Sequence, residues 1–132
     1  MRNSLGGSSS VASSQQHKNQ FQKNKVAIDK VKTLQAPPND WLITMAFYAA
    51  VHLIEYKIVD LTGRGTGSHT ARQNEMNKLK TVFRPIAPYY STLETYSHRS
   101  RYRCESFHES DVNKILSYLE DIEKHILDRT TQ

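Results

Sequence analysis

Apolar residues recur along much of this chain at steps of three, four or seven positions, which places them on one face of an α-helix. The most regular stripe lies toward the C-terminal end and comprises Val112, Ile115, Leu116, Leu119, Ile122 and Ile126. Ser110 or Asp111 stands just before it, and both are residue types that cap helix N termini. We therefore expect a final helix that buries this stripe in a core.

A second amphipathic stripe predicts an earlier helix with lysines on its opposite face. Its apolar members are Phe21, Ile28, Val31 and Leu34. The consecutive residues Pro37 and Pro38 end this helix, because proline cannot continue the hydrogen-bond ladder. Asn39 or Asp40 can then cap the next helix.

The following segment, from Trp41 to about Leu61, is apolar nearly all round, and Gly63 marks its end. A helix without a consistent polar face must be surrounded by others, so we expect it at the centre of the fold. Its most apolar part, up to Ile54, contains polar interruptions and falls short of the roughly 20 residues that span a bilayer. The sequence therefore predicts a core helix and no membrane partner.

Two shorter helices are expected in the middle of the chain. The glycine-rich stretch from Gly63 to Gly67 predicts a loop, after which Ser68 or Thr70 caps a helix that ends near Phe83. The inner face of that helix is predicted to hold Met76, Leu79 and Phe83. Pro88 is suited to the first turn of the next helix. The inward positions of that helix are predicted to be Tyr89, Leu93, Tyr96 and Ser100.

No segment shows the two-residue alternation of a strand, so the predicted fold class is all-α. A chain of 132 residues suits one domain, and we expect a four- to five-helix up-and-down bundle with a flexible N-terminal tail. Residues 1–18 are predicted to be this tail or an expression remnant, because they are rich in Gly, Ser and Gln. Residues 19–132 are predicted to form the bundle.

Cysteine usage and the first residues bear on the compartment. Cys104 is the only cysteine, so no intrachain disulfide can form and a reducing compartment is the simplest setting. The stretch from Met1 to Gln20 lacks the apolar run of a signal peptide. We therefore expect a cytoplasmic protein.

Positive charge is concentrated in one region. The chain carries 18 Lys and Arg against 13 acidic residues, and the stretch 61–110 holds eight basic residues against four acids. Arg99, Arg101 and Arg103 lie close together there, beside Tyr102, and such a combination can hold phosphates and stack on bases. The alternative is a solvated helix end whose arginines pair with Glu94 or Glu105.

An arginine and a histidine near the last helix junction could act together. Arg103 or Arg101 precedes His108 by a few positions. The imidazole can move a proton near neutral pH, while the guanidinium stabilises the charged state formed when a ribose 2′-hydroxyl attacks the neighbouring phosphate. This chemistry requires no metal or cofactor, and the histidines lack zinc-site spacing.

Two polar side chains share a face of the otherwise apolar central helix. Tyr48 and His52 are four positions apart and need partners, which His69 and Arg72 on the following helix could supply. One interpretation is a polar pocket between helices. The other is an internal hydrogen-bond network that fixes how the helices pack.

Three parts of the sequence together resemble the HEPN superfamily. They are Phe47 to His52 on the central helix, His69 to Arg72 at the start of the next, and Tyr90 to Leu93 leading to Arg101, Tyr102 and Arg103. The likeness covers roughly residues 26–127.

The resemblance implies an up-and-down bundle that is commonly a homodimer and acts as a metal-independent endoribonuclease in toxin–antitoxin or defence systems. By that likeness, His108 is the acid/base group and Arg103, or else Arg101, holds the scissile phosphate of RNA. A nucleotidyltransferase-type antitoxin is the implied partner.

The sequence departs from the active members at one point. Those proteins usually place Asn, Asp or His directly after the arginine, whereas Cys104 follows Arg103 here. The alternative is therefore a non-catalytic HEPN-like module for protein interaction or ligand binding. Its predicted pocket residues are Tyr48, His52, His69, Arg72, Arg99 and Tyr102.

Overall fold

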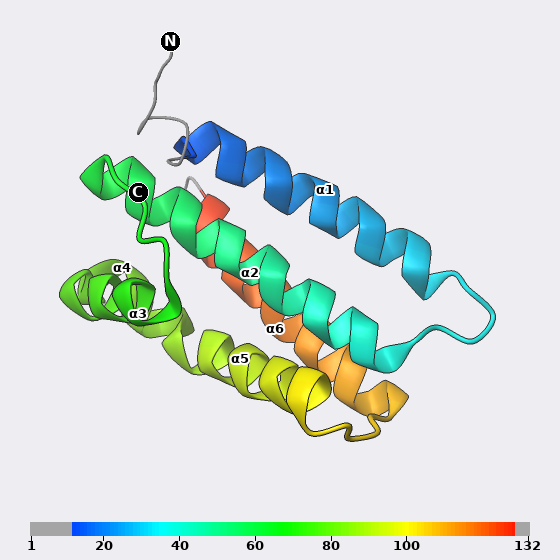
Figure 1. Cartoon of the computed structure of the whole chain (residues 1–132). Coiled ribbons are helices and arrows are strands. Elements are labelled where there is room, and N and C mark those ends of the chain that lie inside the picture. The colour runs from blue at the N-terminus through cyan, green and yellow to red at the C-terminus, as the bar shows by residue number, and fades with distance from the viewer. Residues whose placement is uncertain (1–11, 129–132) are drawn as a thin grey trace, which may run out of the picture.

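The structure, a computed structural model, describes residues 12–128, and this part of the chain is helical without strands (Figure 1). Its helices are α1 (Ser14–Lys32), α2 (Asn39–Thr62), α3 (His69–Lys78), α4 (Lys80–Phe83), the 3-10 turn η2 (Arg84–Ile86), α5 (Ala87–Tyr102) and α6 (Glu109–Leu127). The predicted all-α bundle is confirmed.

Four long helices, α1, α2, α5 and α6, run antiparallel to their chain neighbours, while α3 and α4 are short and lie across one end (Figure 1). Helix α2 contacts all three of the other long helices. It contributes the largest share of the core, including Ile43, Ala46, Ala50, Leu53, Ile54 and Ile58, each 0% exposed. The predicted central position of this helix is confirmed.

Helix α1 begins at Ser14, earlier than the boundary at residue 19 that the composition predicts. A capping box explains the early start: the Ser13 hydroxyl accepts from the Gln16 backbone N–H, and the Gln16 side chain accepts from the Ser13 N–H. The predicted tail must therefore be shortened at its C-terminal side. Residues 1–11 of that tail lie outside the described residues.

The turn between α1 and α2 differs from the sequence expectation. Helix α1 ends at Lys32, so Leu34 falls beyond it and is 54% exposed instead of lying on the inner face. Pro38 takes the N-cap position of α2 without a side-chain bond. Asn39 does not cap the helix; its amide donates to the Phe107 carbonyl (2.9 Å) and ties α2 to the loop before α6.

In the middle of the chain, most of the predicted helix ends lie where they were expected. Gly63 ends α2 in the left-handed conformation (φ 82°), and the Ser68 hydroxyl caps α3 by accepting from the Ala71 N–H. The helix breaks at Leu79, which separates α3 from α4, whereas one helix to Phe83 was expected. Pro88 lies in the first turn of α5, as predicted.

The buried face was predicted more accurately for α6 than for α5. Five of the six predicted residues of α6 are buried, and Leu116 is half-buried. On α5 the fully buried side chains are Tyr90, Leu93 and Ser97, because that face is offset from the predicted Tyr89 and Tyr96. The N-cap of α6 is His108 instead of Ser110 or Asp111.

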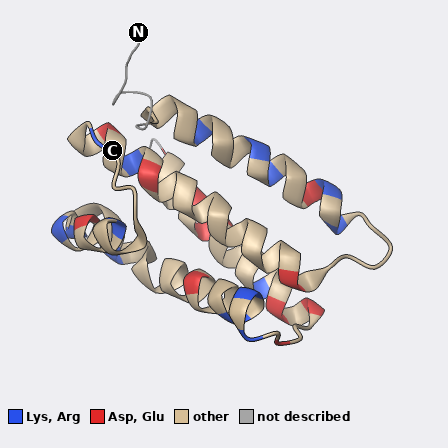
Figure 2. Ribbon diagram, viewed as in Figure 1, with Lys and Arg blue, Asp and Glu red and all other residues tan. Residues whose placement is uncertain are grey.

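By length and composition, helix α2 could cross a membrane, although its most apolar part, up to Ile54, was expected to be too short. In the bundle, 67% of its most apolar window is buried, as in the core helix of a folded domain. Basic residues lie mainly along α1, on α3 and α4, and at the end of α5 (Figure 2).

Candidate functional site

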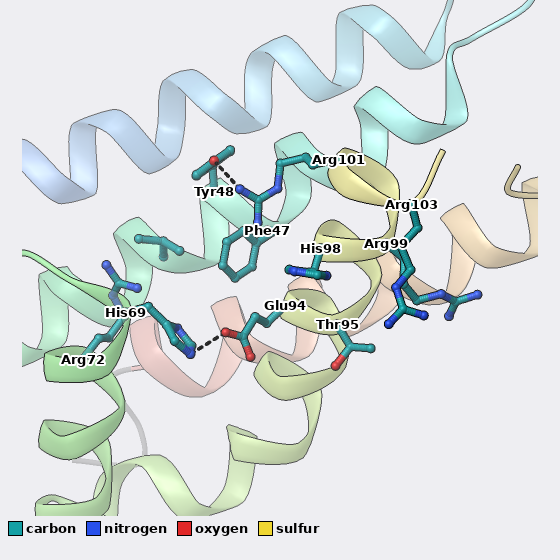
Figure 3. A pocket seen from close by; sticks show the side chains of 11 residues that line it. Phe47, Tyr48, His69, Arg72, Glu94, Thr95, His98, Arg99, Arg101 and Arg103 are labelled. Atoms are coloured by element: carbon teal, nitrogen blue, oxygen red, sulfur yellow. Dashed lines mark hydrogen bonds and ion pairs between the residues drawn. The ribbon is translucent and has the colours of Figure 1, made fainter. Parts of the chain in front are cut away.

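A cavity of about 540 Å³ opens between α2, α3 and α5 (Figure 3). Helix α2 supplies an aromatic wall, α3 one end, and α5 a polar wall that follows the helical repeat of residues 94, 98 and 101. The lining residues are Phe47, Tyr48, Val51, His69, Arg72, Glu94, Thr95, His98, Arg99, Arg101 and Arg103. We refer to this cavity as the arginine pocket.

The pocket is strongly cationic. Four arginines and two histidines line it with a single carboxylate, that of Glu94. The Glu94 carboxylate contacts His69 Nε2 at 2.5 Å, so its charge is directed toward the α3 end (Figure 3). Two arginines are also compensated from outside: Arg72 pairs with Glu55, and Arg99 pairs with Glu105 (2.7 Å).

Arg101 forms no direct ion pair within residues 12–128. Its Nη1 donates to the Tyr48 hydroxyl (3.2 Å) and its Nε to the Ser97 carbonyl (3.3 Å). Its guanidinium carbon lies 5.0 Å from the Tyr102 ring centre, 5.7 Å from that of Tyr48 and 5.8 Å from that of Phe47. The cation is thus held among aromatic faces by neutral acceptors, which leaves its positive field available to an anion.

Arg103 follows at the C-cap of α5, where its backbone N–H donates to the Arg99 carbonyl. Its side chain is exposed and forms no ion pair with a described residue at direct contact distance. The next residue, Cys104, takes the left-handed conformation (φ 53°) that ends the helix. Arg101 and Arg103 are therefore the two arginines of the pocket that form no direct ion pair with a residue in the range 12–128.

Arg72 is anchored by a buried network beneath the pocket. Glu55 on α2 is 4% exposed, and its carboxylate accepts from Arg72 Nε (2.8 Å), the Thr66 N–H (3.0 Å) and the Thr66 hydroxyl. Arg72 Nη1 also donates to the Tyr90 hydroxyl. The loop passes so close that a Cβ on Gly65 would lie 3.2 Å from Glu55 Oε1.

The ionisation of this network follows from its contacts. Burial works to raise the pKa of Glu55, but the hydrogen bonds from Thr66 and Arg72 outweigh it and lower the pKa. Burial also raises the pKa of Tyr90, so its hydroxyl stays protonated. Glu55 and Arg72 are consequently a charged pair. Because its guanidinium is engaged with Glu55, Arg72 lines the pocket but is less free to bind a ligand.

The pocket unites most of the residues predicted from the sequence. Tyr48, His69, Arg72 and Arg99, predicted as pocket residues, and Arg101 and Arg103, predicted as catalytic, all line it. The expected hydrogen bonds of Tyr48 and His52 to His69 and Arg72 do not form, because those two α3 side chains bind Glu94 and Glu55.

His52 and Tyr102 are not among the lining residues. His52 turns toward α1, where its Nδ1 lies 3.0 Å from His17 Nδ1, and both rings border a second cavity of about 550 Å³ that adjoins the arginine pocket at Val51 and Arg72. The pKa of each imidazole is lowered, chiefly because burial disfavours the charged form. Tyr102 lies over Arg101 on the exposed side.

His108 is also outside the arginine pocket. It stands at the N-cap of α6, where its backbone N–H donates to Asp111 Oδ2 (3.0 Å), and its side chain is exposed. The arginine of the predicted Arg–His pair therefore lines the pocket, while the histidine lies beyond the connecting loop. Its catalytic role stays a prediction.

Sequence reasoning did not place Phe47, Glu94 and His98 in the pocket, although His98 adjoins the arginine cluster. The signal was present on α5, where positions 94, 98 and 101 repeat at four and three residues around the arginines. Within residues 12–128, no group of three His, Cys, Asp or Glu side chains is arranged to hold a metal ion. No protein-family model, curated protein or solved structure matches this chain.

Proposed function

We propose that this chain is a HEPN-like domain that binds RNA through the arginine pocket. The observation that carries the proposal is Arg101, whose guanidinium forms no direct ion pair with a described residue and is held among three aromatic rings. Guanidinium groups bind phosphate oxygens, and aromatic faces stack on bases, so one position offers both contacts that a nucleotide requires.

The dimensions and charge of the pocket support the same substrate class. A cavity of about 540 Å³ lies within the range that holds small ligands, which suits one or two nucleotide units. Arg103 adds a second free cation, and an RNA chain supplies a phosphate at every nucleotide. The carboxylates of an acidic peptide would satisfy the charges but would not stack on the aromatic faces.

Metal-independent RNA cleavage is the second candidate function. It is favoured by Arg103, which lines the pocket, and by the exposed side chain of His108 only a short loop away in sequence. In this proposal Arg103 holds the scissile phosphate and His108 transfers the proton, with two copies of the chain forming the active dimer. A nucleotidyltransferase-type antitoxin would then be a partner in the cytoplasm.

Binding is tested by fluorescence anisotropy with a labelled single-stranded RNA decamer. Arg101→Gln should weaken binding by about tenfold or more, because a charge-assisted contact to phosphate is lost. Arg84→Gln is the matched control, since Arg84 is exposed outside the pocket. Equal losses in both variants, or no binding by the parent protein, would overturn the proposal.

Cleavage is tested separately with mixed RNA in excess chelator. The parent protein, His108→Ala and Arg103→Ala are compared at equal concentration. Cleavage by the parent alone supports the nuclease, whereas equal cleavage or none in all three removes it and leaves the binding proposal standing on anisotropy.

A further inference from the structure

The arginine pocket does not end at Arg101. The same side chain lines a smaller hollow of about 230 Å³ with Asp40, Trp41, Thr44 and Ser100, where the start of α2 meets the end of α5. Arg101 is thus shared by two adjoining depressions. A chain molecule bound in the first can continue into the second without leaving the arginine.

Aromatic side chains at this end of the bundle are unusually open to solvent. Trp41 is 62% exposed, Tyr102 is 66% exposed and Tyr48 is 43% exposed. Trp41 and Tyr48 are seven positions apart on α2, which puts them on the same helix face, and Tyr102 meets Arg101 from α5. We call Trp41, Tyr48, Tyr102 and Arg101 the aromatic platform.

The platform stands on fixed elements. The Ser100 hydroxyl donates to the Asp40 carbonyl (2.9 Å) and lies 3.3 Å from the Thr44 hydroxyl. These bonds join the last turn of α5 to the first two turns of α2. Because the two helices are fixed relative to each other, a ligand that contacts both does not have to order them, which lowers the cost of binding.

We propose that the platform makes this chain a reader of unpaired RNA, with a base that leaves the arginine pocket stacking on Trp41. The inference rests on the proposed function and narrows it to single strands, because bases inside a duplex cannot offer their faces to a side chain. The exposed carboxylate of Asp40 beside Trp41 repels phosphate. Asp40 therefore favours binding with a base of the RNA, and not its phosphate backbone, against the Trp41 indole.

Charge also distinguishes RNA from a second copy of the chain as the occupant. Exposed aromatic rings suit a dimer interface, but a copy packed over the platform would bury both the Asp40 carboxylate and Arg101, which forms no ion pair with residues 12–128 of its own protomer. Burying an unpaired cation is costly. A polyanion with planar bases satisfies both the rings and the charge.

Trp41 allows a direct test because it is the only tryptophan in the chain. Titration with single-stranded oligoadenylate should quench its fluorescence to saturation at the concentration that saturates anisotropy of the same labelled probe. Trp41→Ala should weaken decamer binding between about fivefold and a hundredfold, the range for loss of one base–aromatic stack. Trp41→Phe should restore most of the affinity, because a ring is retained.

Controls separate the platform from the pocket. Leu61→Ala removes a similarly exposed apolar side chain (46% exposed) at the opposite end of α2 and should leave affinity unchanged. A duplex of the same length should bind more weakly than the single strand at matched salt.

The outcomes distinguish the two proposals. Binding by anisotropy with unchanged Trp41 fluorescence and unchanged affinity of Trp41→Ala overturns the platform and leaves the pocket intact. Equal affinity for the duplex also overturns it. Self-association that Trp41→Ala abolishes assigns the surface to a second copy instead. No binding of any RNA by the parent protein defeats the proposed function itself.

Discussion

The buried pair of Glu55 and Arg72 gives the sharpest prediction for stability. The side chains are only 5% and 11% exposed, and their charged atoms are 2.8 Å apart. In Glu55→Gln the size and shape of the side chain are kept, but its charge is removed. The Arg72 guanidinium, which is largely shielded from water, would then have no counter-ion.

The size of the effect follows from the contacts. Breaking a buried ion pair on one side typically costs about 3–5 kcal/mol, because the remaining charge is stranded. The glutamine oxygen can still accept from the Thr66 N–H, which retains one of the bonds to the loop. We therefore expect the free energy of unfolding to fall by about 3 kcal/mol, at the lower end of that range.

Urea unfolding followed by far-ultraviolet circular dichroism measures this loss. With a typical dependence of about 1–3 kcal/mol per molar urea, the midpoint should fall by roughly 1–3 M. The matched control is Glu123→Gln, which breaks the more exposed pair with Lys25 (2.7 Å) and should cost under about 1 kcal/mol. Equal losses in both variants would refute the reasoning from burial.

Acidity provides an independent check on the same pair. The pKa of Glu55 is lowered in the folded protein, so its contribution to stability is present above its ordinary value of 4.5. It is lost as the pH falls through the folded value. The free energy of unfolding of Glu55→Gln should therefore depend less on pH in this range. The same pH dependence in the parent and the variant would contradict the assigned ionisation of Glu55.

Three further predictions concern single positions. The pKa values of His17 and His52 are lowered mainly by burial, so their stabilising contribution is complete above about pH 6.5 and declines as the pH falls toward the folded pKa values. Melting temperatures measured over this pH range should fall accordingly, and the fall should be smaller when both histidines are replaced by Gln. Cys104→Gly should raise the melting temperature by about 3 °C by relieving the positive φ, and an unchanged melt would count against strain there. Ser97→Ala should stabilise by up to about 1 kcal/mol in urea titration, since its buried hydroxyl has no partner among the described residues; a destabilised variant would show an unrecognised bond.

The bundle could be predicted because apolar spacing and helix-end residues are local signals. Gly63, Ser68 and Pro88 mark helix ends through their own backbone chemistry, and each occupies its expected position. The cap of α6 was misassigned because Ser110 is a better capping residue than His108 by type alone. The bond from the His108 backbone N–H to the Asp111 carboxylate accompanies the earlier helix start.

The pocket was only partly accessible from sequence for a different reason. The arginine cluster and Tyr48 stand out because a charge run and a polar ring on an apolar helix are visible locally. Glu55 was overlooked because its partner Thr66 comes from the following loop and its partner Arg72 from the next helix. Which of several nearby polar groups will pair depends on helix rotation, and periodicity does not define rotation closely enough.

The direction of the terminal helices matters for how the molecule can be handled. Helix α1 begins and α6 ends at one end of the bundle, whereas Trp41 opens α2 at the other (Figure 1). A biosensor chip coupled through either terminal helix would thus leave the indole facing the flowing solution. Immobilisation through a terminal helix therefore offers a way to follow nucleic-acid binding without obstructing Trp41.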